Sequence, residues 1–220
     1  MMNIRIFVLT AVLFFCMVCG VSAGMNAGDV VEFGRYEQDG DLSNGAEPVE
    51  WQVLEKRDGR ALLISRYGLD VRPYHPEFTP VTWAECGLRQ WLNDSFFHTA
   101  FTDEEQARIP EVVNSNPDNP EIGTHGGGDT LDRVFLLSIE EVKQYFPSVK
   151  DRVCGGSPFV LQNGAVIDPK FGTSYWWLRS PGWSRESASI IYSHGLIYAY
   201  GSNVTSAARM VRPVLWIEEK

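Results

Sequence analysis

The turn pair Asp58-Gly59 is the feature of this sequence that most constrains how the chain folds. It lies between two β-rich runs in PVEWQVLEKRDGRALLISRYGLD, residues 48–70. Both residue types suit the positive φ angles of a tight turn, so the segment predicts a β-hairpin. An earlier run, residues 29–38, has alternating apolar positions and is predicted as an entry strand. One face of the hairpin would be buried, namely Trp51, Val53, Leu62 and Ile64.

Three helix starts follow the hairpin, and they share one capping signature. In each, a hydroxyl residue precedes a glutamate by three positions, as in Thr82 and Glu85, Thr102 and Glu105, and Ser138 and Glu141. The hydroxyl accepts a hydrogen bond from an early backbone N–H, and the glutamate accepts one from the backbone of the cap. These signatures predict helices over residues 83–92, 103–109 and 139–146, with a strand over 133–137.

The segment between the second and third helices, residues 112–132, is rich in Asn, Pro, Gly and Asp. This composition predicts a long surface loop within one domain. The loop offers oxygen ligands of the kind that bind calcium, namely Asn116, Asp118, Asn119 and Glu121. Solvated turns have this composition more often, so no cofactor is predicted and calcium stays an alternative.

The last quarter of the chain has the pattern of short strands, predicted over residues 174–180, 187–193, 196–200 and 209–217. His194 and Gly195 mark a hairpin tip. A two-residue loop would pair Ile191 with Tyr198. A three-residue loop, with Gly195 in the left-handed region and a bulge, would pair Ile191 with Ile197. We favour the second register because it turns two aliphatic side chains to the core and leaves the tyrosines on the other face, namely Tyr192, Tyr198 and Tyr200.

The first 23 residues have the pattern of a secretory signal peptide. Arg5 precedes an apolar run over residues 6–18, and small residues end at Ala23, after which we place the cleavage. An uncleaved membrane anchor and a lipid-modified Cys19 are the alternatives, but the run is short for a span and a bulky residue precedes the cysteine. We predict a secreted or periplasmic protein with one domain, residues 24–220, that is not an integral membrane protein after cleavage.

The charge of that domain limits its partners. Residues 1–23 contain one basic residue and no acidic one, so the domain has 18 basic and 28 acidic residues and a net charge of −10 (18 − 28). The sequence has no basic stripe, so nucleic acid is not expected as a partner. Anionic membrane surfaces are unfavourable for the same reason.

Cys86 and Cys154 are the two cysteines of the domain. Export permits a disulfide between them, which would stabilise the fold by about 4 kcal/mol in the chain-entropy model. Two separate buried thiols are the alternative. The sequence does not decide between these, because it does not show whether the two Cα atoms lie within about 7 Å.

The sequence contains no convincing catalytic constellation. No metal-binding spacing links its four histidines, which are His75, His98, His125 and His194. His125 lies in GTHGGGD, which is similar to an oxyanion-hole loop of lipases, but the G-x-S-x-G nucleophile motif is missing. A carboxylate pair for glycoside hydrolysis stays an alternative, with four unranked candidates: Glu50, Glu55, Asp70 and Asp168.

Aromatic and arginine residues are concentrated near the C-terminus. Because alternate side chains of a strand face opposite sides, one set is expected to fill the core, either Trp176 with Leu178 or Trp177 with Arg179. We interpret four residues as structural, with the arginines holding loops by fork-like hydrogen bonds: Trp176, Arg179, Arg212 and Trp216. Residues of types that dominate binding hot spots lie between these, and they are the candidates for ligand binding. They are Trp183, Arg185, Tyr192, His194, Tyr198, Tyr200 and Asn203.

Seven segments carry a resemblance to known proteins: EFGRY (32–36), VEWQVLE (49–55), ALLISRYGLD (61–70), TWAECGLRQWLN (82–93), VFLLSIEEVKQYF (134–146), WWLRSPG (176–182) and VRPVLWI (211–217). They resemble a bacterial family of unknown function whose members end in WWLRSPG…VRPALWI. That family is similar in fold to C-type lectin-like domains, especially formylglycine-generating enzymes and the variable proteins of diversity-generating retroelements.

The resemblance implies an α+β domain with a C-type lectin-like fold, in which two main helices lie beside small antiparallel sheets with long irregular loops. It places the terminal strands together, and it places the ligand face of the retroelement variable proteins on residues 183–203. Two departures bear on function. No cysteine follows Cys154, unlike in formylglycine-generating enzymes, and the calcium-binding Glu-Pro-Asn motif of true C-type lectins is missing.

We therefore expect an exported, non-catalytic domain that binds a protein or a glycan through its aromatic C-terminal hairpin. The expectation rests on the aromatic-rich segment 183–203 in a chain without a nucleophile-base pair or metal set. One alternative is an enzyme of unknown class that uses carboxylates in a cleft. Another is a structural module of a cell-envelope assembly.

Overall fold

The computed structural model describes residues 24–219, and the predicted Asp58-Gly59 hairpin lies within its first sheet. Asp58 and Gly59 have φ angles of 53° and 72°, so the predicted turn is confirmed. All strand pairs of this sheet are antiparallel. Its order is β1 (Val30–Tyr36), β2 (Glu47–Arg57), β3 (Arg60–Ser65), β12 (Val214–Glu218) and β7 (Val134–Phe135). The predicted signal peptide, residues 1–23, lies outside the described residues.

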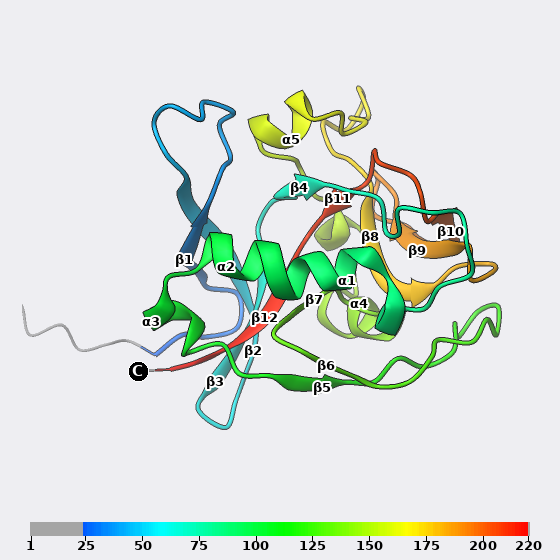
Figure 1. Cartoon of the computed structure of the whole chain (residues 1–220), viewed down its shortest axis with the longest axis horizontal. Coiled ribbons are helices and arrows are strands. Elements are labelled where there is room, and N and C mark those ends of the chain that lie inside the picture. Colours follow the sequence, from blue (N-terminus) through cyan, green and yellow to red (C-terminus); the bar gives the residue numbers. More distant parts are fainter. Residues whose placement is uncertain (1–23, 220) are drawn as a thin grey trace, which may run out of the picture.

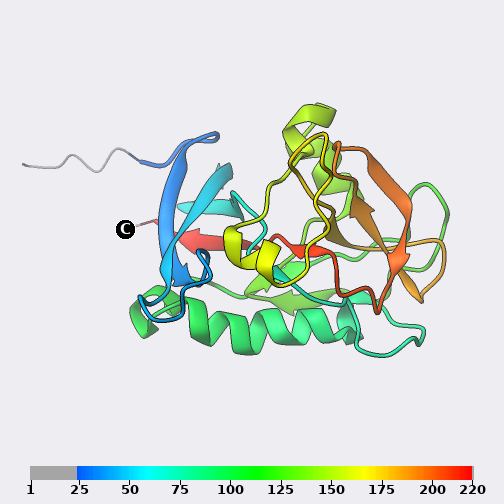
Figure 2. The ribbon, with the colours of Figure 1, turned by 90° about the horizontal axis from the view of Figure 1, so that it is seen from above.

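A second five-stranded sheet contains the strands predicted over residues 174–180, 187–193 and 196–200. The single strand predicted over 209–217 is wrong, because its first part lies in this sheet and its second part lies in the first sheet. The order of the second sheet is β10 (Ile197–Asn203), β9 (Ser187–Ile191), β8 (Trp176–Pro181), β11 (Met210–Val211) and β4 (Asp70–Val71). Strands β8 and β11 pair in parallel, whereas the other pairs are antiparallel. Figure 2 shows the two sheets toward opposite ends of the molecule, and the chain passes between them from β3 to β4 and from β11 to β12. The α+β class with small, mainly antiparallel sheets is confirmed.

A long helix runs along one side of the molecule (Figures 1 and 2). It consists of α1 (Gly87–Trp91), a π-helical turn (Leu92–Phe96) and α2 (Phe97–Ala100). The helix predicted over residues 83–92 is therefore wrong at both ends. It continues because apolar side chains of its second half are buried in the core, namely Phe96, Phe97 and Ala100. Tertiary packing of this kind supplies most of the stability of a helix in a protein.

The start of this helix differs from the predicted capping box. Residues Trp83–Glu85 form a 3₁₀ turn, and the backbone is extended at Cys86. The Thr82 hydroxyl contacts the Glu85 carboxylate at 3.4 Å and caps no backbone N–H. The Cys86 sulfur instead accepts a hydrogen bond from the backbone N–H of Arg89 at 3.4 Å. The α-helix therefore begins about one turn later than the signature indicated.

The other two predicted capping boxes are confirmed. Thr102 and Glu105 cap α3 (Asp103–Gln106), and Ser138 and Glu141 cap α4 (Ile139–Tyr145). Helix α3 is shorter than predicted. Two short elements were not predicted, a 3₁₀ turn (Val149–Arg152) and α5 (Pro158–Gln162). The Ser157 side chain caps α5, and Pro158 occupies its first turn, where a missing N–H costs nothing.

The segment 112–132 is not a surface loop throughout, so that prediction is wrong. A two-stranded sheet joins its ends, with β5 (Val112–Asn114) antiparallel to β6 (Thr130–Asp132). Five polar residues of the segment are buried, namely Asn114, Asn116, Asn119, Thr130 and Asp132. Buried polar groups need hydrogen-bond partners, and these residues find them across the domain.

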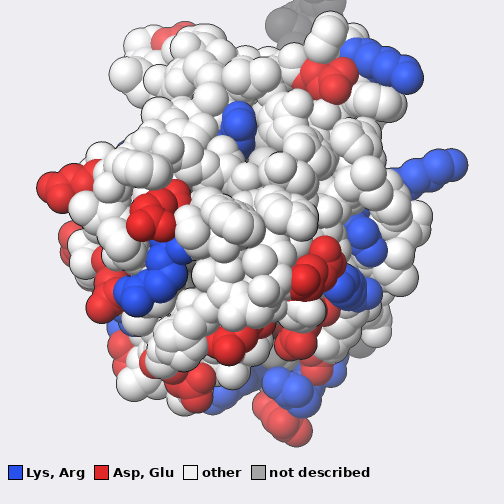
Figure 3. Space-filling model, turned by 90° about the vertical axis from the view of Figure 1, so that its right-hand side faces the viewer, with Lys and Arg blue, Asp and Glu red and all other residues white. Residues whose placement is uncertain are grey.

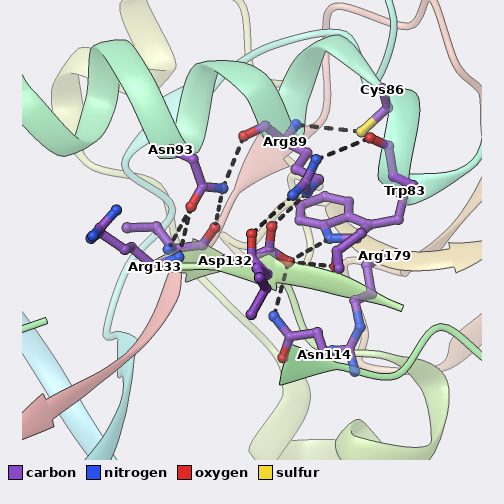
Figure 4. A network of polar contacts seen from close by, with 12 residues as sticks. Trp83, Cys86, Arg89, Asn93, Asn114, Asp132, Arg133 and Arg179 are labelled. Atoms are coloured by element: carbon purple, nitrogen blue, oxygen red, sulfur yellow. Dashed lines mark hydrogen bonds and ion pairs between the residues drawn. The ribbon is translucent and has the colours of Figure 1, made fainter. Parts of the chain in front are cut away.

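Asp132 is the centre of a buried polar network (Figure 4). This carboxylate is 1% exposed and accepts hydrogen bonds from Trp83 Nε1 at 3.0 Å and from Arg89 Nε at 2.5 Å. It also accepts bonds from Asn114 Nδ2 at 2.9 Å and from Thr130 Oγ1 at 2.7 Å. The network therefore fixes the β5–β6 hairpin to the long helix.

The network continues from Asp132 to Arg179. Asn116 Nδ2 donates to Thr130 Oγ1 at 3.3 Å, and Asn116 Oδ1 accepts from Arg179 Nε at 3.2 Å. The remaining guanidinium N–H groups donate to two backbone carbonyls and, in a bidentate pair, to the Glu141 carboxylate. All five N–H groups of Arg179 thus have an acceptor, which is what burial of this cation requires.

Strand β8 is buried on both faces, so the expected division of its side chains into one inner and one outer set is wrong. Every residue from Trp176 to Pro181 is buried. The indoles of Trp176 and Trp177 donate to the carbonyls of Arg152 and Arg72 at 3.0 and 2.9 Å. The 3₁₀ turn at Trp83–Glu85 and helix α4 both contact β8, which lies between β9 and β11. The polar side chains of the strand, Arg179 and Ser180, have hydrogen-bond partners, as burial requires.

Arg212 lies where the chain crosses from β11 to β12. Its guanidinium carbon is 5.1 Å from the ring centroid of Trp176 and 5.3 Å from that of Phe146. Nε donates to the Ser65 carbonyl at 2.9 Å, and burial lowers the pKa of the guanidinium. Beyond the crossing, Arg57 lies 5.2 Å from the ring of Trp216. These contacts hold the segment that joins the two sheets.

Cys86 and Cys154 are both buried and unbonded, so the structure contains the two separate thiols rather than the disulfide. Burial raises the pKa of Cys86 to about 12 and raises that of Cys154 as well. Both side chains are therefore thiols, not thiolates, at neutral pH. The thiolate is the reactive form of cysteine.

We predict that neither thiol reacts with a chromogenic thiol reagent in the folded protein at about pH 8, because burial excludes the reagent and disfavours the thiolate. Titration in denaturant without reductant should count two free thiols. Fewer than two would contradict the two-thiol arrangement.

We also predict that Asp132→Ala lowers the free energy of unfolding by about 3–5 kcal/mol, because it leaves Arg89 and several donors without their buried partner. Lys143→Ala is the control, since Lys143 pairs with Glu121 on the surface and should contribute less than about 1 kcal/mol. Urea unfolding measures both changes. Equal effects would contradict a special role for the Asp132 network.

Candidate binding site on the C-terminal hairpin

Strands β9 and β10 form the hairpin in the second predicted register. Ile191 pairs with Ile197, and Gly195 at the tip has a φ of 89°. The Gly195 N–H donates to the Tyr192 carbonyl at 2.8 Å. A Cβ at Gly195 would lie 1.9 Å from the Val149 carbonyl, so both the angle and the space require glycine. The predicted pairing of Ile191 with Ile197 is confirmed.

This register places four aromatic rings in one continuous line, which we call the aromatic strip: Trp183, Tyr200, Tyr198 and Tyr192. The rings of Trp183 and Tyr200 are 6.5 Å apart and nearly parallel, at 15°. Tyr200 and Tyr198 are 6.0 Å apart, and Tyr198 and Tyr192 are 4.8 Å apart. Side chains two positions apart on a strand share a face, which explains why Tyr198 and Tyr200 are neighbours.

Further rings extend the strip beyond Tyr192. The imidazole of His194 stacks on Tyr192 at 5.3 Å and 14°, and Phe171 lies 6.1 Å from His194. Tyr175 contacts Tyr192 at 5.5 Å, and the Arg209 guanidinium lies 4.8 Å from the Tyr175 ring. Partial burial among these groups raises the pKa of the Tyr192 phenol, which is therefore neutral at physiological pH.

The strip is accessible to solvent, most of all at its Trp183 end. Trp183 is 65% exposed and Tyr200 is 55% exposed, whereas Tyr192 and Tyr198 are half-buried. A cleft of about 520 Å³ lies at this end, and Phe78, itself 64% exposed, forms part of it. The cleft is lined by Phe78, Trp183, Ser184, Glu186, Ser187, Tyr198, Tyr200, Gly201 and Asn203. Exposed neighbouring aromatic side chains of this kind characterise binding surfaces.

The face of the molecule that carries β10 is shown in Figure 3. Residues other than Lys, Arg, Asp and Glu occupy much of its centre, and charged side chains gather mostly toward its lower part and rim. The centre of this face is thus largely uncharged, on a chain whose net charge is −9 over 220 residues. This favours a ligand with apolar or uncharged surface.

Asn119 holds the backbone under the strip. Its amide group donates to the Pro181 carbonyl at 2.8 Å and to the Ala199 carbonyl at 2.9 Å. Thr124 Oγ1 donates to the Trp183 carbonyl at 3.0 Å. The segment 117–128 therefore supports the hairpin from below, a role that sequence reasoning missed because nothing local in the sequence links an asparagine to partners 62 and 80 positions away.

Two glycines permit the close approach of the backbone at this end of the strip. A Cβ on Gly182 would lie 2.6 Å from the Tyr200 carbonyl, and one on Gly201 would lie 2.2 Å from the Ala188 carbonyl. Gly201 also has a φ of 76°, within the irregular part of the β9–β10 pairing. Glycine at these positions lets β10 bend and brings Tyr200 beside Trp183.

Two predicted site residues have partners away from the strip. Arg185 NH2 lies 3.7 Å from the Glu85 carboxylate. Asn203 lines the cleft, but its side-chain oxygen accepts hydrogen bonds from Thr205 N and Oγ1 at 2.9 and 2.8 Å. The structure therefore groups five of the seven candidates in one chain of ring contacts: Trp183, Tyr192, His194, Tyr198 and Tyr200.

The four carboxylates considered for glycoside hydrolysis have separate sets of partners. Glu50 pairs with Arg66, and Glu55 accepts a 2.5 Å hydrogen bond from Tyr145. Asp70 accepts a 2.6 Å bond from Tyr36, and Asp168 accepts a 2.9 Å bond from Ser193. Burial of the ring, with Glu55 beside it, raises the pKa of Tyr145 well above its usual range. Tyr145 also lines a second cleft, of about 270 Å³, together with Glu141 and Trp216.

The four residues considered for calcium have separate sets of partners. Asn116 and Asn119 are buried and use their side chains in the contacts described above. Asp118 contacts His125 Nδ1 at 2.8 Å, and Glu121 pairs with Lys143. Among residues 24–219, a different acidic group places ligand atoms within 4.8 Å of one another, namely Glu37, Asp39 and Glu47.

The comparisons with known proteins identify a family but no function. The model of a domain of unknown function, DUF6273, matches residues 58–219. No curated protein and no solved structure matches the chain. Within residues 24–219, no helix is both long enough and apolar enough to span a membrane.

We predict that Asn119→Ala loosens the hairpin, because it removes the hydrogen bonds to Pro181 and Ala199. The free energy of unfolding should fall by about 1–3 kcal/mol, and amide hydrogen exchange should accelerate over residues 181–203 more than over β2 and β3. Asn163→Ala is the control, since among residues 24–219 the side chain of the exposed Asn163 hydrogen-bonds only to Phe159, within its own helix end. A uniform acceleration across both sheets would contradict the local role.

Proposed function

The chain belongs to the DUF6273 family, a domain of unknown function, and we propose that it is a non-catalytic binding domain whose aromatic strip contacts a protein or a glycan. The observation that carries the proposal is the continuous contact of four exposed or half-exposed rings, from Trp183 to Tyr192, beside a cleft of about 520 Å³. Tyr and Trp supply large contact area at low cost in side-chain entropy, which is why they dominate binding surfaces.

Contacts beneath the strip also favour a rigid binding surface. Asn119 and Thr124 hold its backbone, and Gly195 and Gly201 fix the shape of the hairpin. Rigid rings lose little freedom on binding, so more of the contact energy remains as affinity. Binding through such a surface requires no catalytic residue.

We further propose that the domain is exported and has a C-type lectin-like fold. Export rests on the pattern of residues 1–23, and the fold rests on the resemblance of the WWLRSPG and VRPVLWI motifs. Strands β11 and β12, which contain the second motif, join the two sheets, so this motif closes the domain. We propose secretion or a periplasmic location on the same basis.

The carboxylate-based enzyme receives less support from the arrangement of its candidates. Glu50, Glu55, Asp70 and Asp168 each engage different partners. A glycosidase pair needs two carboxyl groups that face one scissile bond, at about 5–9.5 Å from each other. A structural envelope module would leave the exposed ring faces of the strip without a specific role.

The binding proposal is tested with arrays of defined peptides and of defined glycans, probed with residues 24–220 and with the triple variant Trp183→Ala, Tyr192→Ala, Tyr198→Ala. At least one class of probe should bind the unchanged protein and lose at least about tenfold in affinity with the triple variant. Tyr67→Ala, at an exposed tyrosine outside the strip, is the control and should retain binding.

Binding that is the same for the triple variant and the unchanged protein would contradict the proposal. So would the absence of any bound probe on both arrays. Thermal unfolding of each variant shows whether a loss of binding reflects the surface or the fold.

A further inference from the structure

We infer that the ligand of the aromatic strip is a proline-rich segment of another protein, held in the extended polyproline II conformation beside a basic residue. This inference rests on the proposed binding function and commits it to one class of partner. The observations that carry it are the ring geometry of the strip, the polar groups that line its cleft, and the position of Glu186.

The ring geometry suits a chain of prolines. Trp183 and Tyr200 are nearly parallel, and Tyr198 and Tyr192 continue the line at 6.0 and 4.8 Å. Grooves lined by aromatic rings are the common binding sites of polyproline II segments, whose pyrrolidine rings pack on the ring faces. A polyproline II segment is already extended in solution. Its binding to rigid rings therefore costs little conformational entropy, either in the peptide or in the protein.

The polar groups of the cleft favour a peptide over a sugar. A glycan carries many hydroxyl groups, and each one buried without a hydrogen bond costs free energy. Ser187 Oγ donates to the Ser184 carbonyl and accepts from Ser184 N, and the Asn203 oxygen is occupied by Thr205. These two side chains therefore offer a sugar few free acceptors. The N–H and O–H donors of Trp183, Tyr198 and Tyr200 also line the cleft, and they suit a proline segment, whose backbone has carbonyl acceptors and no N–H groups.

Glu186 predicts a basic residue next to the prolines of the ligand. It is the single acidic or basic residue among those that line the cleft. Within residues 24–219, no ion pair involves its carboxylate, whereas the neighbouring Arg185 pairs with Glu85. An unpaired carboxylate at the edge of an uncharged surface selects a cation, so a Lys or Arg beside the prolines would complete the contact.

The test measures the affinity of residues 24–220 for three synthetic peptides: ten prolines followed by one arginine, ten prolines alone, and a Gly-Ser decapeptide followed by one arginine. Quenching of tryptophan fluorescence and calorimetry give the dissociation constants. We expect the first peptide to bind best, the second to bind about two- to fivefold more weakly because it lacks an exposed ion pair, and the third not to bind.

Two variants locate the contacts. Trp183→Ala should weaken both proline peptides by at least about tenfold. Glu186→Gln should weaken the arginine-containing peptide to the level of the proline-only peptide and leave the latter unchanged. Tyr67→Ala should change none of these constants.

Chitohexaose and cellohexaose provide the opposing outcome. One outcome overturns the inference but leaves the proposed binding function standing. In it, either sugar binds to the unchanged protein but not to Trp183→Ala, and the proline peptides do not bind. If the proline peptides bind equally well to Trp183→Ala, the inference is also overturned. If no peptide, sugar or array probe depends on the strip, the proposed function itself fails.

Discussion

The bidentate pair between Arg179 and Glu141 is the interaction on which the rest of the structure depends. Both groups lie largely out of water, and an unpaired charge there would cost several kcal/mol. All five guanidinium N–H groups have acceptors, and the Glu141 carboxylate also accepts the backbone N–H of Ser138 at 2.8 Å. One carboxylate thus completes a helix cap and neutralises a buried cation.

The Arg179–Glu141 pair is connected to the aromatic strip through hydrogen bonds of the segment that contains Asn116 and Asn119. Asn116 links Arg179 to Thr130 and so to Asp132, which fixes the long helix. The same segment of chain continues to Asn119, whose amide donates hydrogen bonds to the last residue of β8 and to the middle of β10. The buried polar network and the exposed aromatic strip are therefore held by the same segment of the chain. A rigid interior is what allows exposed rings to keep a defined spacing.

Local patterns in the sequence predicted the elements whose geometry depends on neighbouring residues. Asp58-Gly59 specifies its turn through two φ angles, and the boxes at Thr102 and Ser138 specify helix starts within one turn of chain. The hairpin register at Gly195 followed from matching two aliphatic residues across a short loop. In each case the deciding interaction spans only a few positions of the sequence.

The predictions were wrong where contacts between residues far apart in the sequence determine the local structure. Cys86 rather than Thr82 caps the long helix because the chain first makes a 3₁₀ turn. The composition of 112–132 suggested a solvated loop, yet its asparagines are buried by partners far along the chain. Of the candidate site, the tyrosines and Trp183 were visible as types, but Asn119 beneath them and Phe78 across the cleft were not.

Hydrogen exchange measured along residues 24–220, with and without a saturating amount of the arginine-flanked proline peptide, tests most directly whether the aromatic strip is the binding surface. We expect slower exchange over residues 181–203 and at the cleft residue Phe78, with β2 and β3 unchanged. Slower exchange around the cleft of Tyr145 and Trp216, with residues 181–203 unaffected, would contradict this expectation.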